Sequence, residues 1–220
     1  MNNNLPKKNH VAIIGAGIAG LSCAIQLQAL GFQVQIYEKS RGVSGRMSTR
    51  RAEDWSADHG AQYFTARNPL FIKELNQWIA LNVAAIWNPR LKVFEGDQWR
   101  DSLSTENRYV GIPAMNSPGK HLAKNLPIQF NHPIDRISYD QGKWQLHSPE
   151  TGDIEELYDW LVLAMPAPQT IALAKSIDQS IEAFAMNADM QGCWTVMASF
   201  TENLNLPFDA AFINNERISW

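Results

Sequence analysis

The feature that most constrains the fold of this chain is a glycine-rich turn between a short apolar run and a helical pattern. Residues 11–14 are apolar and typical of a strand buried on both faces, and residues 15–20 fit the pattern G-x-G-x-x-G. Apolar side chains then recur at helical spacing over residues 21–30, and Gly31 ends the pattern. A strand, a glycine-rich turn and a helix in this order predict a dinucleotide-binding βαβ unit.

Each glycine of the turn has its own expected role. Gly15 allows the tight turn, Gly17 lets a pyrophosphate approach the backbone, and Gly20 lets the helix pack close to the strand. The free N–H groups at the start of the helix would face the phosphates. A second strand is expected over residues 33–37, and Glu38 at its end can accept hydrogen bonds from the ribose of an adenosine. The same carboxylate would repel a 2′-phosphate, which argues against NADP.

The segment after this carboxylate is a basic loop. Residues 39–47 contain two glycines and two arginines, and an arginine offers a fork of donors that matches phosphate oxygens. The loop is therefore a candidate for a second element close to the phosphates. A solvated basic loop is the commoner meaning of such a composition, and the residues alone leave this alternative open.

Further along the chain, helical and strand patterns alternate. Asn68 caps one expected helix with Pro69 behind it, and Ser117 starts a shorter helix that ends near residue 125. Strands are expected at residues 93–94 and 98–99, 134–139 and 143–147, 154–157, 160–164, 195–200, 210–213 and 217–220. The chain thus starts as a parallel α/β unit, continues through an antiparallel excursion and returns to a buried strand.

Composition excludes several classes of protein. The net charge of −3 and the lack of a basic run give no electrostatic footprint for nucleic acid. No apolar stretch approaches about 20 residues, and the polar residues 1–10 are unlike a signal peptide, so we expect a cytoplasmic protein that does not cross a membrane. Cys23 and Cys193 lack metal-ligand spacing, so neither a metal site nor a disulfide framework is expected. The last expected strand stops at Trp220, which suggests a fragment of something longer.

Four segments resemble the FAD-containing amine oxidase superfamily, most closely its renalase-like branch. They are residues 38–47, 58–65, 109–116 and 163–166. The first resembles the glycine-arginine motif of that superfamily, and the second resembles the segment that runs along the flavin. The resemblance implies an α/β fold: a Rossmann-like FAD/NAD(P)-binding domain, whose parallel sheet carries an antiparallel β-meander insertion, and a partial antiparallel substrate domain.

The resemblance also implies a division of the chain. Residues 1–66 and 126–175 would form the FAD-binding domain. Residues 67–125 and 176–220 would belong to the substrate domain, whose second part is expected to be truncated. A glycine-aspartate segment that closes over FAD near the C-terminus of this family has no counterpart here. The two cysteines lack the context of a covalent flavin linkage, so the FAD is expected to be noncovalent.

Several cofactor contacts follow from the resemblance. Backbone N–H groups around Ala19 would contact the pyrophosphate, and Arg46 would reach the phosphates or the ribityl chain. Gln62 and Tyr63 would lie beside the isoalloxazine, and Ile134, in a strand over residues 133–137, would face the adenine edge. The full expected set is Gly15, Gly17, Ile18, Ala19, Gly20, Glu38, Lys39, Gly45, Arg46, Gln62, Tyr63, Ile134 and Ala164.

No catalytic side chain is assigned, because a flavin accepts a hydride at its own N5 and the protein supplies orientation and electrostatics. The leading hypothesis is an FAD-dependent oxidoreductase that oxidises a small hydride donor, either a dihydronicotinamide isomer or an amine, with O2 as acceptor. An NAD-dependent dehydrogenase would explain residues 15–38 but would leave residues 41–46 and 62–63 without a role. A truncated, noncatalytic nucleotide-binding protein is the third possibility. Substrate identity and oligomeric state stay open.

Overall fold

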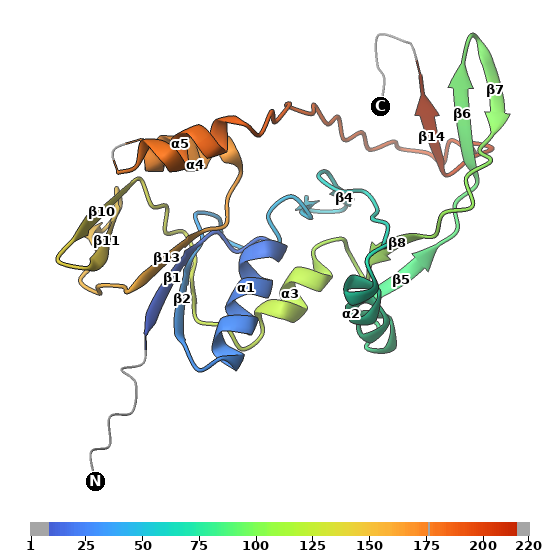
Figure 1. Cartoon of the computed structure of the whole chain (residues 1–220). Coiled ribbons are helices and arrows are strands. Elements are labelled where there is room, and N and C mark those ends of the chain that lie inside the picture. The colour runs from blue at the N-terminus through green and yellow to red at the C-terminus, as the bar shows by residue number, and fades with distance from the viewer. Residues whose placement is uncertain (1–8, 176, 215–220) are drawn as a thin grey trace. The chain divides into compact units, whose positions relative to one another are not determined.

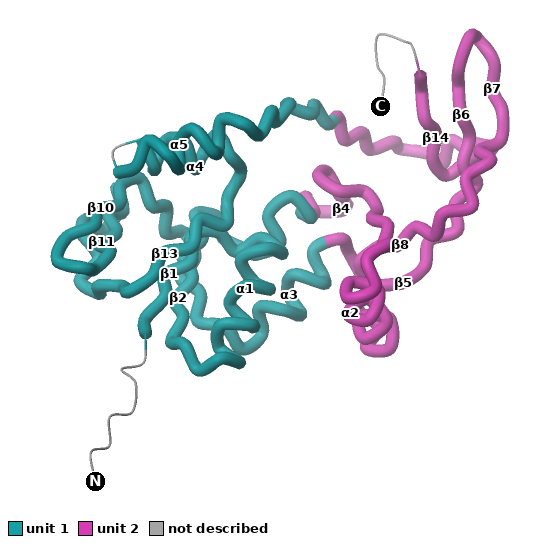
Figure 2. The backbone as a smooth tube through the Cα atoms, viewed as in Figure 1, with its two compact units in different colours: residues 1–48, 116–195 teal, residues 49–115, 196–220 magenta. Residues whose placement is uncertain are grey.

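A computed structural model of the chain describes residues 9–175 and 177–214. These residues form two compact units, which are described separately (Figure 2). Unit 1 comprises Met1–Ser48 and Asn116–Thr195, and unit 2 comprises Thr49–Met115 and Val196–Trp220. The units are defined by contacts within the chain, whereas the division expected from the sequence concerns cofactor and substrate roles and stays a prediction.

Unit 1 is built on a parallel sheet with the strand order β13-β1-β2-β9 (Figure 1). Each neighbouring pair of strands is parallel. The strands are β1 (His10–Ile14), β2 (Gln33–Tyr37), β9 (Ile128–Gln129) and β13 (Trp160–Leu163). The expected parallel start and the expected strand at residues 160–164 are therefore confirmed. The expectation that this strand is buried is wrong, because β13 lies at the end of the strand order, Trp160 is 59% exposed and the other three residues are half-buried. The two-residue strand β9 carries too short a pattern to be predicted.

One face of this sheet is covered by helices α1 (Ile18–Ala29) and α3 (Ser117–Ala123) (Figure 1). Val11 and Ile13 of β1 are buried and pack with apolar residues of α1, including Leu21. Side chains alternate between the faces of a strand, so every second residue of β1 meets these helices. Residues 15–17 join β1 to α1, so the glycine-rich turn leads directly into this helix.

The opposite face of the sheet packs on an antiparallel meander. Ala12 and Ile14 of β1 form a second apolar cluster with Ile137 and Leu146 of the meander and with Leu173 of α4. The elements on this side are β10 (Arg136–Asp140), β11 (Lys143–Ser148), β12 (Gly152–Asp153), α4 (Ala167–Ala174) and α5 (Gln179–Met186). The parallel sheet with a meander insertion confirms the expected fold class.

The third meander strand was misplaced in the sequence prediction, which put it at residues 154–157. Ser148 already pairs with Gly152, so β12 starts immediately after the turn. Beyond β12, the N–H of Ile154 donates to the Leu146 carbonyl oxygen at 2.8 Å and Tyr158 forms an isolated bridge to Trp144. Pairing with β11 therefore continues only at single residues.

Unit 2 contains a helix packed on a two-stranded ribbon and a short hairpin. The elements are α2 (Pro69–Ala80), β5 (Ala84–Trp87), β8 (Arg108–Gly111), β3 (Thr49–Arg51) and β4 (Ser56–Asp58). As predicted, α2 begins after Asn68, whose side-chain oxygen accepts from the N–H of Leu70 at 2.9 Å. Phe64 stacks on Tyr109 and meets the edge of Trp78, so aromatic rings make the core between helix and ribbon.

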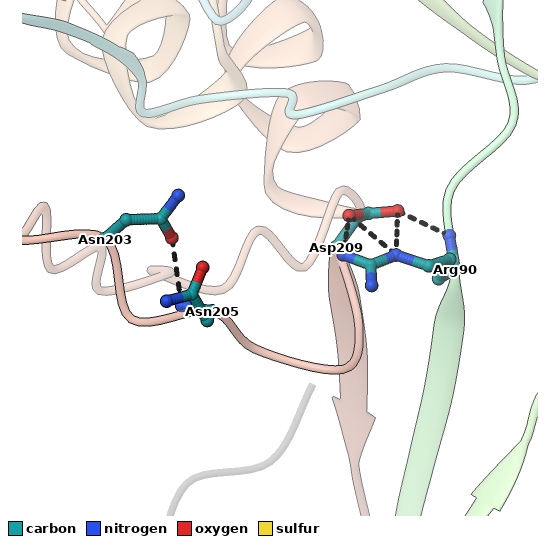
Figure 3. A network of polar contacts seen from close by, with 4 residues as sticks. All are labelled: Arg90, Asn203, Asn205 and Asp209. Atoms are coloured by element: carbon teal, nitrogen blue, oxygen red, sulfur yellow. Dashed lines mark hydrogen bonds and ion pairs between the residues drawn. The ribbon is translucent and has the colours of Figure 1, made fainter.

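A second part of unit 2 is a three-stranded sheet with the order β14-β6-β7, made of β6 (Leu91–Glu95), β7 (Gln98–Asp101) and β14 (Ala210–Ile213). The β6–β7 hairpin and the strand at 210–213 were predicted. The strand β14 pairs parallel with β6, and Arg90 binds Asp209 through both carboxylate oxygens at the start of both strands (Figure 3). The expected turn from Asn214 and the strand at 217–220 lie at or beyond the end of the described residues.

The strand expected at residues 195–200 does not form. No described strand pairs with this segment in a ladder, and the side chains of Trp194 and Val196 are 99% and 92% exposed. A strand requires a neighbour that bonds its backbone groups. The alternating pattern therefore indicates only strand propensity, because no described strand is available to pair with this segment. No described helix is long and apolar enough to cross a membrane.

Candidate dinucleotide-binding site

The glycine-rich turn joins β1 to α1, and two of its glycines are required by the fold. Gly15 has a φ of +109°, which disfavours a side chain, and a Cβ there would lie 2.5 Å from the Ala164 carbonyl oxygen. A Cβ on Gly20 would collide with the Gly15 carbonyl oxygen. These two positions hold strand, turn and helix in close contact.

Gly17 is different, because nothing in the protein requires it to lack a side chain. Its backbone is extended, with φ −73° and ψ 173°, and a Cβ there would meet no atom within 4 Å. Gly17 is the N-cap of α1 and provides no capping side chain, so the first N–H groups of the helix, at Ile18 and Ala19, have no intrahelical partner. The open space and the free donors together form a cradle for an anion.

The carboxylate of Glu38 lies against this turn. The residue is 7% exposed. Its Oε2 accepts a hydrogen bond from the N–H of Ala16 at 2.8 Å, and its Oε1 accepts one from the N–H of Ser40 at 2.8 Å. The sequence predicted a ribose contact for this residue, and that role stays a prediction. The sequence did not reveal that the same carboxylate accepts a hydrogen bond from the backbone of the glycine-rich turn.

The basic loop over residues 39–47 packs directly beside the glycine-rich turn. The N–H of Ser44 donates to the Ala16 carbonyl oxygen at 2.9 Å, and Ser44 forms an isolated bridge with Gly17. Ser44 is 2% exposed, and its hydroxyl donates to the carbonyl oxygen of Asn116, the residue before α3, at 3.0 Å. Gly119 of α3 approaches Ser44 so closely that a Cβ would collide with it. No local pattern in the sequence pointed to these contacts.

Three expected cofactor contacts lie on this basic loop. Gly45 has a φ of +53°, and a Cβ there would be 3.4 Å from the Cα of Gly17. Arg46 is exposed and makes no hydrogen bond or ion pair with any described residue, so its guanidinium is available to an anion. The amine of Lys39 donates to Gln169 Oε1 at 3.2 Å on the surface.

Two further expected cofactor contacts, Ala164 and Ile134, lie next to strands of unit 1. The N–H of Ala164 donates to the Ile14 carbonyl oxygen at 2.9 Å, at the edge of the sheet where the glycine-rich turn lies. Ile134 was expected in a strand over residues 133–137, but β10 begins at Arg136. The preceding segment instead bonds to the end of β2, where the N–H of His132 donates to the Glu38 carbonyl oxygen at 2.9 Å. The first bond across to β11 is made by the N–H of Asp135, which donates to the His147 carbonyl oxygen at 3.2 Å, so the ladder starts after Ile134.

Gln62 and Tyr63 belong to unit 2. Gln62 is exposed, and the ring of Tyr63 lies 5.9 Å from that of Trp87. The guanidinium of Arg108 is 5.4 Å from the centre of the Tyr63 ring, within the range of a cation–π contact. The expected position of Gln62 and Tyr63 beside the isoalloxazine stays a prediction.

A buried pair of phenols supports the strand that ends at Glu38. The hydroxyls of Tyr37 and Tyr158 are 2.6 Å apart, and Tyr158 donates to Glu156 Oε2 at 3.0 Å. Burial raises the pKa of both phenols, most strongly that of Tyr158. Both groups are therefore neutral at ordinary pH and act as hydrogen-bonding supports.

Two other features do not coincide with this site. An open apolar groove of about 610 Å³ lies between the meander and helices α4 and α5, and none of the expected cofactor contacts lines it. Among residues 9–175 and 177–214, no group of three or more histidine, cysteine, aspartate or glutamate side chains is arranged to hold a metal ion.

Comparisons with known proteins find matches for the part of the chain that contains the glycine-rich turn. Residues 13–77 match the family described as "NAD(P)-binding Rossmann-like domain". An L-amino-acid oxidase from Siganus canaliculatus is 39% identical over 83 residues, which are 37% of this chain and 15% of that protein. One from Crotalus adamanteus is 49% identical over 55 residues, 25% of this chain and 10% of that protein. The chain therefore matches only a small part of the length of these relatives.

Solved structures share the fold at low sequence identity. A putative protoporphyrinogen oxidase from Exiguobacterium sp. 255-15 gives a TM-score of 0.63 at 12% identity, over 80% of this chain and 64% of that chain. A redesigned putrescine oxidase gives a TM-score of 0.60 at 12% identity, over 75% of this chain and 59% of that chain. Residues 13–77 of this chain therefore match an NAD(P)-binding Rossmann-like domain, and part of the chain is similar in sequence to L-amino-acid oxidases.

Proposed function

We propose that the chain binds FAD noncovalently and acts as an FAD-dependent oxidoreductase. The observation that carries the proposal is the contact of the basic loop with the phosphate loop through Ser44 and Ala16. The contact holds the basic loop against the turn at Gly17, and the exposed guanidinium of Arg46 on this loop is available to bind a phosphate. A generic NAD site needs only the first loop and the carboxylate at Glu38, so the second loop favours FAD.

The residues present fit the ADP half of this cofactor. A Cβ at Gly17 would meet no protein atom within 4 Å, so a pyrophosphate could approach the backbone there, where the N–H groups of Ile18 and Ala19 at the start of α1 would be its donors. Glu38 would hold the ribose and Arg46 would bind a phosphate oxygen or the ribityl chain. The resemblance to the amine oxidase superfamily favours a contact of Gln62 and Tyr63 with the flavin ring.

The chemistry that a bound flavin supplies is acceptance of a hydride at N5, with O2 as the proposed final acceptor. The residues of this chain would bind and orient the cofactor. We propose a small hydride donor as substrate, and the resemblance to the renalase-like branch favours a dihydronicotinamide isomer over an amine. We further propose a cytoplasmic location, with no nucleic-acid or membrane partner.

The visible spectrum of the purified chain after incubation with FAD tests the proposal. We expect the absorption bands of bound flavin to survive gel filtration, and we expect FAD fluorescence to change on titration. A colourless chain that takes up no FAD would overturn the proposal. Binding of NAD with no affinity for FAD would instead support a dehydrogenase.

A second measurement separates an enzyme from a noncatalytic nucleotide-binding protein. Amines and dihydronicotinamide isomers are added without oxygen to the FAD-loaded chain. Bleaching of the flavin bands by one of these donors, and their return on admission of O2, is the expected result. Stable binding with no bleaching by any donor would identify a binding protein.

A further inference from the structure

The carboxylate of Glu38 has an arrangement that a ribose-binding role does not require. A carboxylate that served only a ribose could point to solvent until the ligand arrived. Instead it is buried and accepts two backbone N–H groups, those of Ala16 and Ser40, each at 2.8 Å. No described lysine, arginine or histidine forms an ion pair with it, so these two donors are its main compensation.

The two donors belong to the two loops of the cofactor site. Ala16 lies inside the glycine-rich turn, and Ser40 opens the basic loop that carries Arg46. The carbonyl oxygen of Ala16 in turn accepts the N–H of Ser44. Ala16 is thus held through its N–H by Glu38 and through its carbonyl by the basic loop. Hydrogen bonds to a charged acceptor are about twice as strong as neutral ones.

We propose that Glu38 is a positioning residue for the phosphates, which orders both loops before the cofactor binds. The inference rests on the proposed function, because it assumes that a pyrophosphate binds at this turn. A carboxylate has about four lone-pair positions, and two of them are used by the loops. The remaining positions can still accept the ribose hydroxyls, so both roles operate in the same complex.

The two roles make different predictions for a ligand that lacks the ribose hydroxyls. If Glu38 acted only through the ribose, removing those hydroxyls would make its substitution harmless. If Glu38 orders the loops, its substitution weakens binding of the phosphates whether or not the hydroxyls are present. A thermodynamic cycle between the side chain and the ligand hydroxyls therefore separates the two roles.

The experiment measures binding of ADP and of 2′,3′-dideoxy-ADP to the full chain by titration calorimetry. The variant is Glu38→Gln, which keeps the shape but has only one acceptor oxygen for the two N–H groups. We expect its affinity for dideoxy-ADP to fall at least about fivefold and its affinity for ADP to fall further. Unchanged affinity for dideoxy-ADP would overturn the proposal. Glu155→Gln, at an exposed glutamate with no assigned contact, is the matched control.

Amide hydrogen exchange of the unliganded native chain provides a test that needs neither ligand nor variant. Ser40 is exposed, so its N–H should exchange rapidly unless the Glu38 carboxylate protects it. We expect protection of the Ser40 amide of at least about tenfold over that of Arg41, which has no such acceptor. Equal exchange would refute the ordering role. If the native chain binds neither FAD nor ADP but shows this protection, the proposed function fails, whereas the ordering of the basic loop by Glu38 is supported.

Discussion

Substitution of Gly17 by valine separates the requirements of the fold from those of the ligand. A Cβ at Gly17 meets no protein atom within 4 Å, and the extended backbone there accommodates any residue. Loss of backbone freedom in the unfolded chain favours the variant by about 0.4–1 kcal/mol. Loss of glycine at an N-cap opposes it by up to about 1 kcal/mol. The two effects nearly cancel, so the free energy of unfolding of the unliganded chain should change by less than about 1 kcal/mol.

The effect on the cofactor should be much larger. A branched side chain at Gly17 fills the space that the pyrophosphate would occupy and separates it from the N–H groups of Ile18 and Ala19. Each hydrogen bond to a charged group contributes about 1.5–3 kcal/mol, so the loss of even one lowers FAD affinity about tenfold or more. Fluorescence titration with FAD measures this loss, and urea unfolding of the unliganded chain measures stability.

The matched comparison is Gly20→Ala, for which the expected pattern is different. A Cβ at Gly20 would collide with the backbone oxygen of Gly15, and overpacking of this kind costs about 1–3 kcal/mol. Gly20→Ala should therefore lower stability before any cofactor is added. Unchanged FAD affinity in Gly17→Val would refute the placement of the pyrophosphate. Unfolding of Gly17→Val would refute the conclusion that the space at this position is open.

Three further substitutions test other contacts. Tyr158→Phe should lower the free energy of unfolding in urea by about 1–2 kcal/mol, because it leaves the buried Tyr37 hydroxyl without its partner. The variant with phenylalanine at both positions should lose less than the sum of the two single changes, and additive losses would contradict a coupled pair. The ion pair with Arg90 lowers the pKa of Asp209 to about 2 from 3.8, so the stability from this carboxylate is complete above pH 3.8 and is lost as the pH falls toward 2. Substitution of Arg90 by alanine should raise the pKa of Asp209 toward 3.8 in an NMR titration, with a part of the lowering kept by the backbone N–H of residue 90, which still donates to this carboxylate; an unchanged pKa would exclude the side-chain contact. Asn68→Ala should cost about 1 kcal/mol in thermal unfolding because α2 loses its cap, whereas Asn68→Asp should retain most of the stability.

Local patterns predicted the elements that position the site. The apolar run before Gly15, the spacing of Gly15, Gly17 and Gly20, and the carboxylate at Glu38 are all contained within one βαβ unit. Each is set by backbone geometry over a few residues, so the sequence displays it directly. The α2 helix was predictable for the same reason, because Asn68 and Pro69 act on the first turn that follows them.

Contacts between distant parts of the chain were not predictable. Ser44 and Asn116 are 72 positions apart, and neither residue type indicates by itself that they meet. The later start of β10, after Ile134, depends on the distant strand β11, since the first bond between the two segments joins Asp135 and His147. A strand pattern describes the propensity of a segment, whereas its boundaries depend on which backbone groups are available to pair.

The sequence by itself determined that this chain has a dinucleotide-binding turn, since that motif is defined by the backbone conformations that glycine allows. Only the tertiary structure decided that Gly17 alone, among the three glycines of the turn, is not required by the fold, because that conclusion depends on the atoms around each Cβ. The tertiary structure also decided that the basic loop docks on the turn and that Glu38 bonds both loops. These contacts form because the carboxyl ends of parallel strands lie at one edge of the sheet. The loops that follow the strands meet there, although their residues are distant in sequence.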